Sequence, residues 1–220
     1  RGEFIVMITD DDPVYPNMLQ SLYDLHTKHP GYGSYFGGCN IKCYSVTAAY
    51  VMRSKVGMNS CLSSEMDYGE IKIYEANEFP YLFLLGKLGS LLLWSCGIIK
   101  REILIKNGGM PDYGSEYFTD HAFNLVNCSD KGMVYINKPL GHQSIHGQNF
   151  GFTNMQHFDK YQSTPDKFVH WVKSKLATRE DWGEIEKSLL SFTGRAVVEF
   201  SLFIKRTLDI NKFPSENFHV

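Results

Sequence analysis

The sequence lacks an excess of charge of either sign and lacks a long hydrophobic run. Its 220 residues include 22 Lys and Arg against 24 Asp and Glu, a formal net charge of -2. A surface that follows nucleic-acid phosphates needs an excess of basic residues, so nucleic acid is not an expected partner. No stretch approaches the roughly 18 consecutive apolar residues of a membrane-spanning helix. We therefore expect a soluble globular chain.

Cysteine is sparse and unpatterned. The chain has five Cys residues, an odd number, and no CxxC pair of the kind that binds zinc. Cys39 and Cys43 are the one close pair, and on a strand they would share one face, which favours packing over metal binding. No signal peptide precedes them, so we expect reduced thiols and a cytoplasmic location.

The hydrophobic pattern predicts strands and helices interspersed along the chain, which is typical of the α/β class. In chain order, the expected elements are a buried strand (4–8), a helix with Asn17 as its N-cap (17–29), one or two strands (35–50), a loop (54–78), a segment that fits helix or strand (82–93), two helices (98–107 and 118–129) and a strand (132–136).

The composition changes near residue 151. Residues 157–212 carry apolar side chains at helical spacing, which predicts two or three helices. We expect a core over 1–150 and a helical extension over 151–220, without a second independent core.

Three consecutive aspartates, Asp10, Asp11 and Asp12, follow the first predicted strand. Adjacent carboxylates repel and raise one another's pKa unless a cation or hydrogen-bond donors neutralise them. A hard cation, Mg²⁺ or Mn²⁺, whose shell is completed by substrate phosphates is one such neutraliser. The alternative is a solvated acidic turn in which Asp12 caps the next element before Pro13.

Two later clusters also carry reactive side chains. One runs from Trp94 and Gly97 to Asp120, which is expected at the start of a helix, where the macrodipole favours an anion. An N-cap or first-turn role accounts for Asp120 equally well. The other cluster, 142–149, holds His146. A loop histidine is more often structural or exposed than a metal ligand.

The clusters follow one another in a fixed order: strand, acidic triplet, PNML, WSCGIIKREILIKNGGM, YFTDHAFNLV, and GMVYINKPL followed by SIHGQN. This order resembles the family 2 glycosyltransferases of the GT-A fold over residues 1–150. The resemblance implies a mixed sheet flanked by helices. Family members open with a βαβ unit that binds the nucleotide base, and nothing of it precedes Arg1. The chain is therefore expected to be N-terminally truncated, and the isolated fragment to bind donor poorly or to be inactive.

The resemblance further implies an inverting, metal-dependent transferase that moves a sugar from a nucleotide-diphospho-sugar to the hydroxyl of a saccharide or glycolipid acceptor. The implied site residues are a catalytic base (Asp120), a donor-diphosphate site (Asp10, Asp11 and Asp12), metal ligands (Asp10, Asp12 and His146) and sugar or acceptor contacts (Trp94, Gly97 and Thr119). Core packing is the competing explanation for Trp94.

The sequence departs from the family pattern in two places. Aligning Pro16 with the family's proline puts the first acidic position on Thr9 and the second on Asp11, so the carboxylates that touch the metal stay open. Thr119 stands where the family often has a glutamate before the base.

The family context implies bacterial polysaccharide or glycolipid assembly at the inner face of a membrane. The C-terminal helices would then contact the membrane or a second subunit. Two other functions stay open. A nucleotidyltransferase also uses strand-end carboxylates and Mg²⁺, although the chain has no glycine-rich phosphate loop. A truncated binding module without activity is the non-enzymatic alternative.

Overall fold

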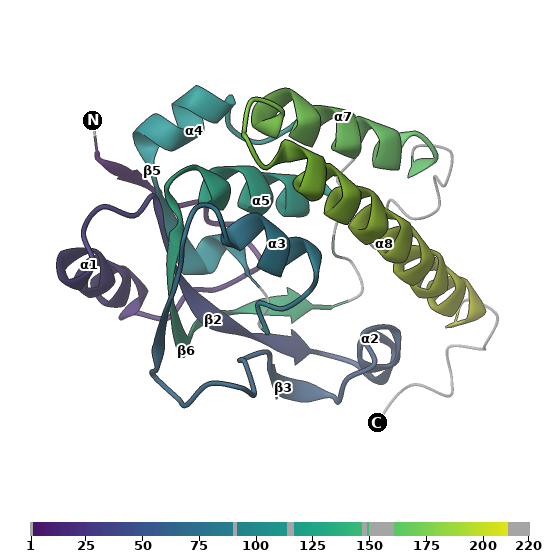
Figure 1. Cartoon of the computed structure of the whole chain (residues 1–220). Helices are drawn as coiled ribbons and strands as arrows, with labels where there is room; N and C mark the ends of the chain where they lie inside the picture. The colour runs from purple at the N-terminus through teal and green to yellow at the C-terminus, as the bar shows by residue number, and fades with distance from the viewer. Residues whose placement is uncertain (1, 90–91, 114–116, 147–148, 150–160, 211–220) are drawn as a thin grey trace.

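A six-stranded mixed sheet with helices on both faces forms the centre of the computed structural model (Figure 1). The structure describes residues 2–89, 92–113, 117–146, 149 and 161–210. The strands are β1 (Phe4–Ile5), β2 (Ser34–Cys43), β3 (Gly57–Ser60), β4 (Ile71–Tyr74), β5 (Gly97–Lys100) and β6 (Met133–Ile145). The helices are α1 (Met18–Lys28), α2 (Val46–Val51), α3 (Phe79–Leu84), the 3-10 turn η1 (Trp94–Cys96), α4 (Arg101–Asn107), α5 (Thr119–Lys131), α7 (Thr164–Leu176) and α8 (Trp182–Ile210). The predicted α/β class is confirmed.

The strand order is β1-β5-β2-β6-β4, with β3 added to the end of β2. β2 and β6 are parallel, whereas the remaining pairings between the described strands are antiparallel. The parallel pair ends with Cys43 beside Ile145, so the carboxyl ends of both strands meet at one edge. Loops at this edge are where α/β proteins usually place their ligands.

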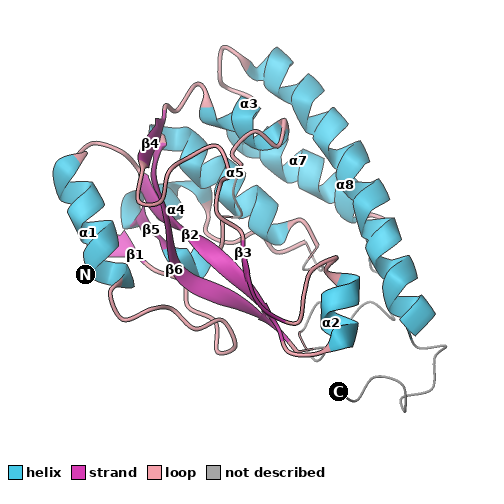
Figure 2. Cartoon of the chain, turned by 90° about the horizontal axis from the view of Figure 1, so that it is seen from below, coloured by secondary structure: helices cyan, strands magenta, loops and turns pink. Residues whose placement is uncertain are grey.

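The elements form four layers, which Figure 2 shows edge-on. α1 covers one face of the sheet, and its buried residues Met18, Leu22 and Leu25 pack on Tyr35 and Val134. α3, α4 and α5 cover the other face, and α7 and α8 lie outside them as the fourth layer.

The two C-terminal helices share a hydrophobic cluster with α3 and α5. Phe168 of α7 is fully buried and stacks on Phe118, with ring centroids 4.6 Å apart and an interplanar angle of 9°. The predicted helical segment is confirmed over the described residues 164–210, and residues 150–160 and 211–220 lie outside the description. Within the described residues, no helix combines the length and the apolar run needed to cross a membrane.

Several predicted elements are confirmed. α1 and α5 fall where the apolar spacing places them, and the strand expected at 132–136 is present but continues to Ile145 as β6. The helix expected over 98–107 is confirmed only in part, because Gly97–Lys100 form β5 and α4 covers Arg101–Asn107. Its C-cap is Gly108, whose left-handed φ of 81° suits glycine. The five cysteines are free, four of them buried and Cys61 half-buried, as predicted.

Other predictions are wrong. The buried strand expected at 4–8 is a two-residue edge strand of half-buried residues, because β1 pairs only with β5, and Ile8 is 59% exposed. The expected second strand near residue 50 is α2, whose N-cap Ser45 accepts a hydrogen bond from the Ala48 N–H. The polar segment 54–78 contains β3 and β4, whose pairing with longer strands overrides their weak local pattern.

Candidate functional site

The acidic turn is fastened to the second half of β6 by main-chain hydrogen bonds. Val14 forms a bridge with Gly141, the Tyr15 N–H donates to the Leu140 carbonyl at 2.8 Å, and the His142 N–H donates to the Pro13 carbonyl at 3.1 Å. Gly141 permits this approach, because a Cβ there would lie 2.9 Å from the Pro13 oxygen. The turn therefore has a fixed position on the sheet.

The three aspartates occupy different environments. Asp10 is exposed and Asp11 half-buried, whereas Asp12 is 7% exposed and its Oδ1 accepts a hydrogen bond from the Ser144 N–H at 2.8 Å. Burial raises the pKa of Asp12, and the Ser144 hydrogen bond opposes that rise. Asp12 thus holds the turn against β6, while Asp11 faces outward.

Asp11 lies beside His146, the first residue after β6. Asp11 Oδ2 is 3.7 Å from His146 Nε2 and accepts a hydrogen bond from Asn149 Nδ2 at 3.2 Å. Asn149 also donates to the Ser144 carbonyl at 2.6 Å and accepts from the His146 N–H at 3.0 Å. Asn149 therefore links the Asp11 carboxylate to the main chain of Ser144 and His146.

Asp11 of the predicted diphosphate site and the predicted metal ligand His146 are the two residues that the structure places side by side. Among the described residues, no three His, Cys, Asp or Glu side chains converge to hold a metal ion. A Mg²⁺ or Mn²⁺ ion that carries substrate phosphates needs only one or two protein carboxylates. The Asp11 carboxylate is one such ligand, whereas the His146 imidazole is a softer donor than a hard cation prefers. Asp10 and Asp12, which were predicted as ligands, lie on either side of Asp11, with Asp12 turned toward the β6 backbone.

His142 is a buried residue of this site to which the sequence pattern gave no role. It is 9% exposed, and neither ring nitrogen has a hydrogen-bond partner in the part of the chain that the structure describes. Burial and the charge of Lys42 lower its pKa, although the Asp12 carboxylate opposes this. A buried polar group without a partner points to a bound water or ligand, because leaving it unpaired is costly.

The predicted base, Asp120, lies at the start of α5, after a strained turn. Phe118 has a left-handed φ of 66° and is 1% exposed, so its packing holds this conformation. Asp120 Oδ1 accepts hydrogen bonds from the His121 N–H and from His121 Nδ1, both at 2.9 Å. The carboxylate itself is 57% exposed, so substrates can reach it.

The Asp120–His121 contact shifts both side chains toward their charged forms. Desolvation acts to raise the pKa of Asp120, but the charge and hydrogen bonds of His121 outweigh it and the pKa is lowered. Desolvation acts to lower the pKa of His121, but the Asp120 carboxylate outweighs it and the pKa is raised. Asp120 is therefore ionised at neutral pH.

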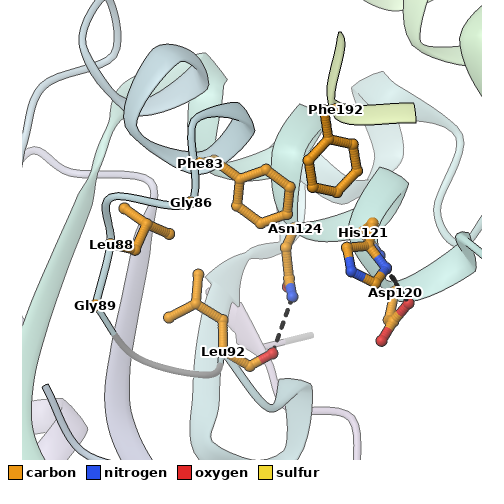
Figure 3. A pocket seen from close by; sticks show the side chains of 9 residues that line it. All are labelled: Phe83, Gly86, Leu88, Gly89, Leu92, Asp120, His121, Asn124 and Phe192. Atoms are coloured by element: carbon orange, nitrogen blue, oxygen red, sulfur yellow. Dashed lines mark hydrogen bonds and ion pairs between the residues drawn. The ribbon is translucent and has the colours of Figure 1, made fainter. Parts of the chain in front are cut away.

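Asp120 and His121 lie at the edge of a pocket of about 230 Å³ (Figure 3). Its other lining residues come from α3, from the loop that follows it, from α5 and from α8: Phe83, Gly86, Leu88, Gly89, Leu92, Asn124 and Phe192. Helix α8 thus supplies one wall through Phe192. An ionised carboxylate beside apolar and aromatic walls can accept a proton from a bound hydroxyl group.

The segment from Leu92 to Cys96 lies between this pocket and the acidic turn. On one side, Asn124 Nδ2 donates to the Leu92 carbonyl at 3.0 Å. On the other side, Cys96 Sγ lies 3.0 Å from where a Cβ of Gly141 would be. Burial raises the pKa of Cys96 to about 12, and the charge of the Asp12 carboxylate contributes to that rise. The pocket is not lined by Asp10, Asp11 or Asp12 themselves.

The predicted sugar contacts lie on or beside the Leu92–Cys96 segment or next to Asp120. Trp94 is half-buried and packs edge-on against Phe123. Gly97 is buried against Phe36, whose ring atoms would lie 2.4 Å from a Cβ at that position. Packing accounts for both residues, and their contact with a sugar stays a prediction. Thr119 is half-buried beside Asp120.

No protein-family model and no curated protein matches this chain. The functional assignment therefore depends on the arrangement of the residues described above.

Proposed function

We propose that this chain is the catalytic part of an inverting, metal-dependent glycosyltransferase with a GT-A-like fold. The observation that carries the proposal is that one short segment, Leu92–Cys96, runs from the Asp120 pocket, which Leu92 lines, to Gly141 of β6, to which the acidic turn is fastened. The Asp11–His146 pair lies on the acidic-turn side, and Asp120 lies on the pocket side.

The acidic-turn side suits the departing group. Asp11 and His146 would hold Mg²⁺ or Mn²⁺, with Asn149 bonded to the Asp11 carboxylate and to the His146 main-chain N–H. When bound, the cation stabilises negative charge on the departing nucleoside diphosphate. Asp12 acts as a positioning residue, because its hydrogen bond to Ser144 fixes the turn that presents Asp11.

The pocket side suits the acceptor. Its Phe83 and Phe192 rings offer apolar faces on which a sugar ring can pack. Asp120 accepts the proton of the acceptor hydroxyl as that oxygen attacks the anomeric carbon, which is general-base catalysis. Both hydrogen bonds from His121 use Oδ1, so Oδ2 is the oxygen assigned to the proton.

Transfer or hydrolysis of nucleotide sugars in the presence of Mn²⁺ tests the base. We expect Asp120→Asn to slow turnover by about 10²- to 10⁴-fold, the usual contribution of a general base. Asp24→Asn, which changes a carboxylate on α1, is the matched control and should have wild-type turnover. Retained turnover in Asp120→Asn would remove Asp120 from this role.

Metal-dependent binding of inorganic diphosphate tests the other side without requiring recognition of a base. Mn²⁺ with diphosphate should raise the thermal unfolding temperature of the wild type and of Asp120→Asn, but not of Asp11→Asn. Equal stabilisation of Asp11→Asn would discredit the acidic turn as the diphosphate site. Stabilisation by nucleoside triphosphates alone would favour a nucleotidyltransferase.

A further inference from the structure

Large apolar side chains gather in solvent at the end of the molecule where β2, β3 and α2 meet. Five residues form this group, each between 39% and 57% exposed: Tyr44, Val46, Tyr50, Val56 and Met58. Together with Lys42, Arg53 and Lys55 we call them the α2–β3 surface. Single exposed apolar residues are ordinary, but a cluster rimmed by polar groups marks an interaction site.

Helix α2 has its larger apolar residues on the outside. Ala48, Ala49 and Val51 are buried against Cys43 and Ile145. Val46 and Tyr50, which are four residues apart and therefore share a helix face, are 39% and 53% exposed. A surface helix normally turns polar residues to water, so this outward face is unusual for one that contacts only solvent.

Strand β3 extends the same surface. Its register pairs Met58 with Lys42 and Gly57 with Cys43, so Val56 and Tyr44 leave the end of the ladder as neighbours. The Lys42 ammonium lies 4.5 Å from the centroid of the Tyr44 ring. Aromatic and basic side chains are therefore interleaved on this surface.

The charge of this region is positive. No Asp or Glu occurs from residue 25 to residue 64, whereas Lys42, Arg53 and Lys55 fall within that range. The far end of α8 adds two basic residues, the exposed Lys205 and Arg206, whose Nε donates to the Val51 carbonyl at 3.1 Å, and one acidic residue, Asp209. Figure 1 shows α2, β3 and this end of α8 at one side of the molecule.

We propose that the α2–β3 surface binds the surface of a membrane that contains anionic lipids. Tyrosine and basic residues are the side chains enriched at the boundary between lipid headgroups and acyl chains. Exposed Val and Met side chains supply apolar contact with that boundary, and the three cations supply attraction to anionic headgroups. Because no acidic residue interrupts this stretch of chain, the charge complementarity favours an anionic lipid surface.

The surface lies next to the candidate donor site. The Tyr44 N–H donates to the Ile145 carbonyl at 3.0 Å, and His146 follows Ile145. The acidic turn and β3 flank the β6–β2 pair, so three strand spacings, roughly 14 Å, separate them. If the proposed function holds, a membrane-bound protein would present its site to an acceptor carried by a lipid.

Co-sedimentation of the 220-residue chain with vesicles tests the proposal, in phosphatidylcholine alone and in phosphatidylcholine mixed with phosphatidylserine. We expect binding to the mixed vesicles that weakens as salt is added. Neutralising one basic residue at an anionic surface weakens binding roughly fivefold. The Lys42→Glu/Lys55→Glu variant reverses two charges, so it should weaken binding by more than that factor for each residue. Tyr50→Ser with Met58→Ser should weaken it by about tenfold or more, from the lost apolar contact.

Matched controls change exposed residues of the same types elsewhere. Tyr68→Ser, at a tyrosine that is 70% exposed, and Lys87→Glu should bind as the wild type does. Absence of wild-type binding to mixed vesicles, or wild-type binding by the Tyr50→Ser/Met58→Ser variant, would overturn the proposal. A dimer that forms as the protein concentration rises and that the Tyr50→Ser/Met58→Ser variant abolishes would also overturn the proposal, because the surface would then be a subunit interface. Vesicle binding needs neither donor nor metal, so its failure is distinct from failure of the transferase assignment.

Discussion

The two candidate sites are held in place by different kinds of contact. The acidic turn is fixed by hydrogen bonds to the β6 backbone, chiefly through Tyr15, His142 and Ser144. The Asp120 pocket is instead lined by side chains from three helices, including Phe192 of α8, and by the loop after α3. The first site therefore depends on the sheet, whereas the second depends on the packing of the C-terminal helices.

The two sites also show how the environment shifts the pKa values of two aspartates in opposite directions. Burial raises the pKa of Asp12, although Ser144 donates a hydrogen bond to it. Desolvation acts in the same direction on Asp120, but the charge and hydrogen bonds of His121 reverse the outcome and lower its pKa. A partner that can carry positive charge thus decides in which direction the pKa of each aspartate moves.

The largest expected effect comes from disturbing the C-terminal helices, of which α8 lines the Asp120 pocket. Phe168→Ala should lower the free energy of unfolding by about 3–5 kcal/mol, because it empties the centre of the cluster shared by α7, α8 and α5. Urea titration measures this effect, and Leu190→Ala, at an exposed position on α8, is the control. The folded fraction of Phe168→Ala should keep its Mn²⁺-diphosphate response, whereas a lost response would show that the acidic turn also depends on these helices.

A smaller effect tests how the sheet holds the acidic turn. Asp12→Ala should cost about 1–3 kcal/mol, because the buried Ser144 N–H loses its acceptor. Asp12→Asn keeps an acceptor oxygen and should cost less. Denaturant unfolding of both variants gives the difference. Equal stabilities for the two would mean that the hydrogen bond does not anchor the turn.

The smallest effect concerns the pH dependence of the Asp120–His121 pair. A raised His121 pKa contributes stability below the ordinary value of 6.5 that is lost as the pH rises through the raised value. A lowered Asp120 pKa contributes stability above the ordinary 3.8 that is lost as the pH falls through the lowered value. The pair therefore stabilises the fold most between these limits, by less than about 1 kcal/mol because both side chains are well exposed.

Replacing His121 tests this window. The wild type should lose stability as the pH is raised from mildly acidic to alkaline, and His121→Gln should lose less. Urea titration at both pH values measures the two losses. His170→Gln, which changes an exposed histidine on α7, is the control and should leave the loss in place. An unchanged pH profile in His121→Gln would mean that the two side chains do not interact in solution.

Local patterns predicted the elements whose buried face follows from spacing alone. Met18, Leu22 and Leu25 recur at helical intervals, and α1 buries those residues. α5 follows the same rule. β1, β3 and β4 were misjudged because a short strand is stabilised by the strand with which it pairs. The local sequence of a short strand does not show which strand that is.

Residue chemistry also predicted which side chains deserved attention, but not their partners. Asp11, Asp120 and His146 were all identified from the sequence. The pairing of Asp11 with His146 spans most of the chain, and Asn149 fixes it. Phe83 and Phe192 of the pocket could not be found, because apolar residues on helices give the same pattern whether they line a pocket or a core.

The sequence by itself determined the α/β class, the helical character of the C-terminal part and the presence of three groups of reactive side chains. Only the tertiary structure decided that Asp12 faces inward and Asp11 outward, that α8 lines the Asp120 pocket through Phe192, and that apolar residues of α2 face solvent. The physical reason is that spacing along the chain fixes which residues share a face. Burial and hydrogen-bond partners are set by whatever distant segment packs against that face.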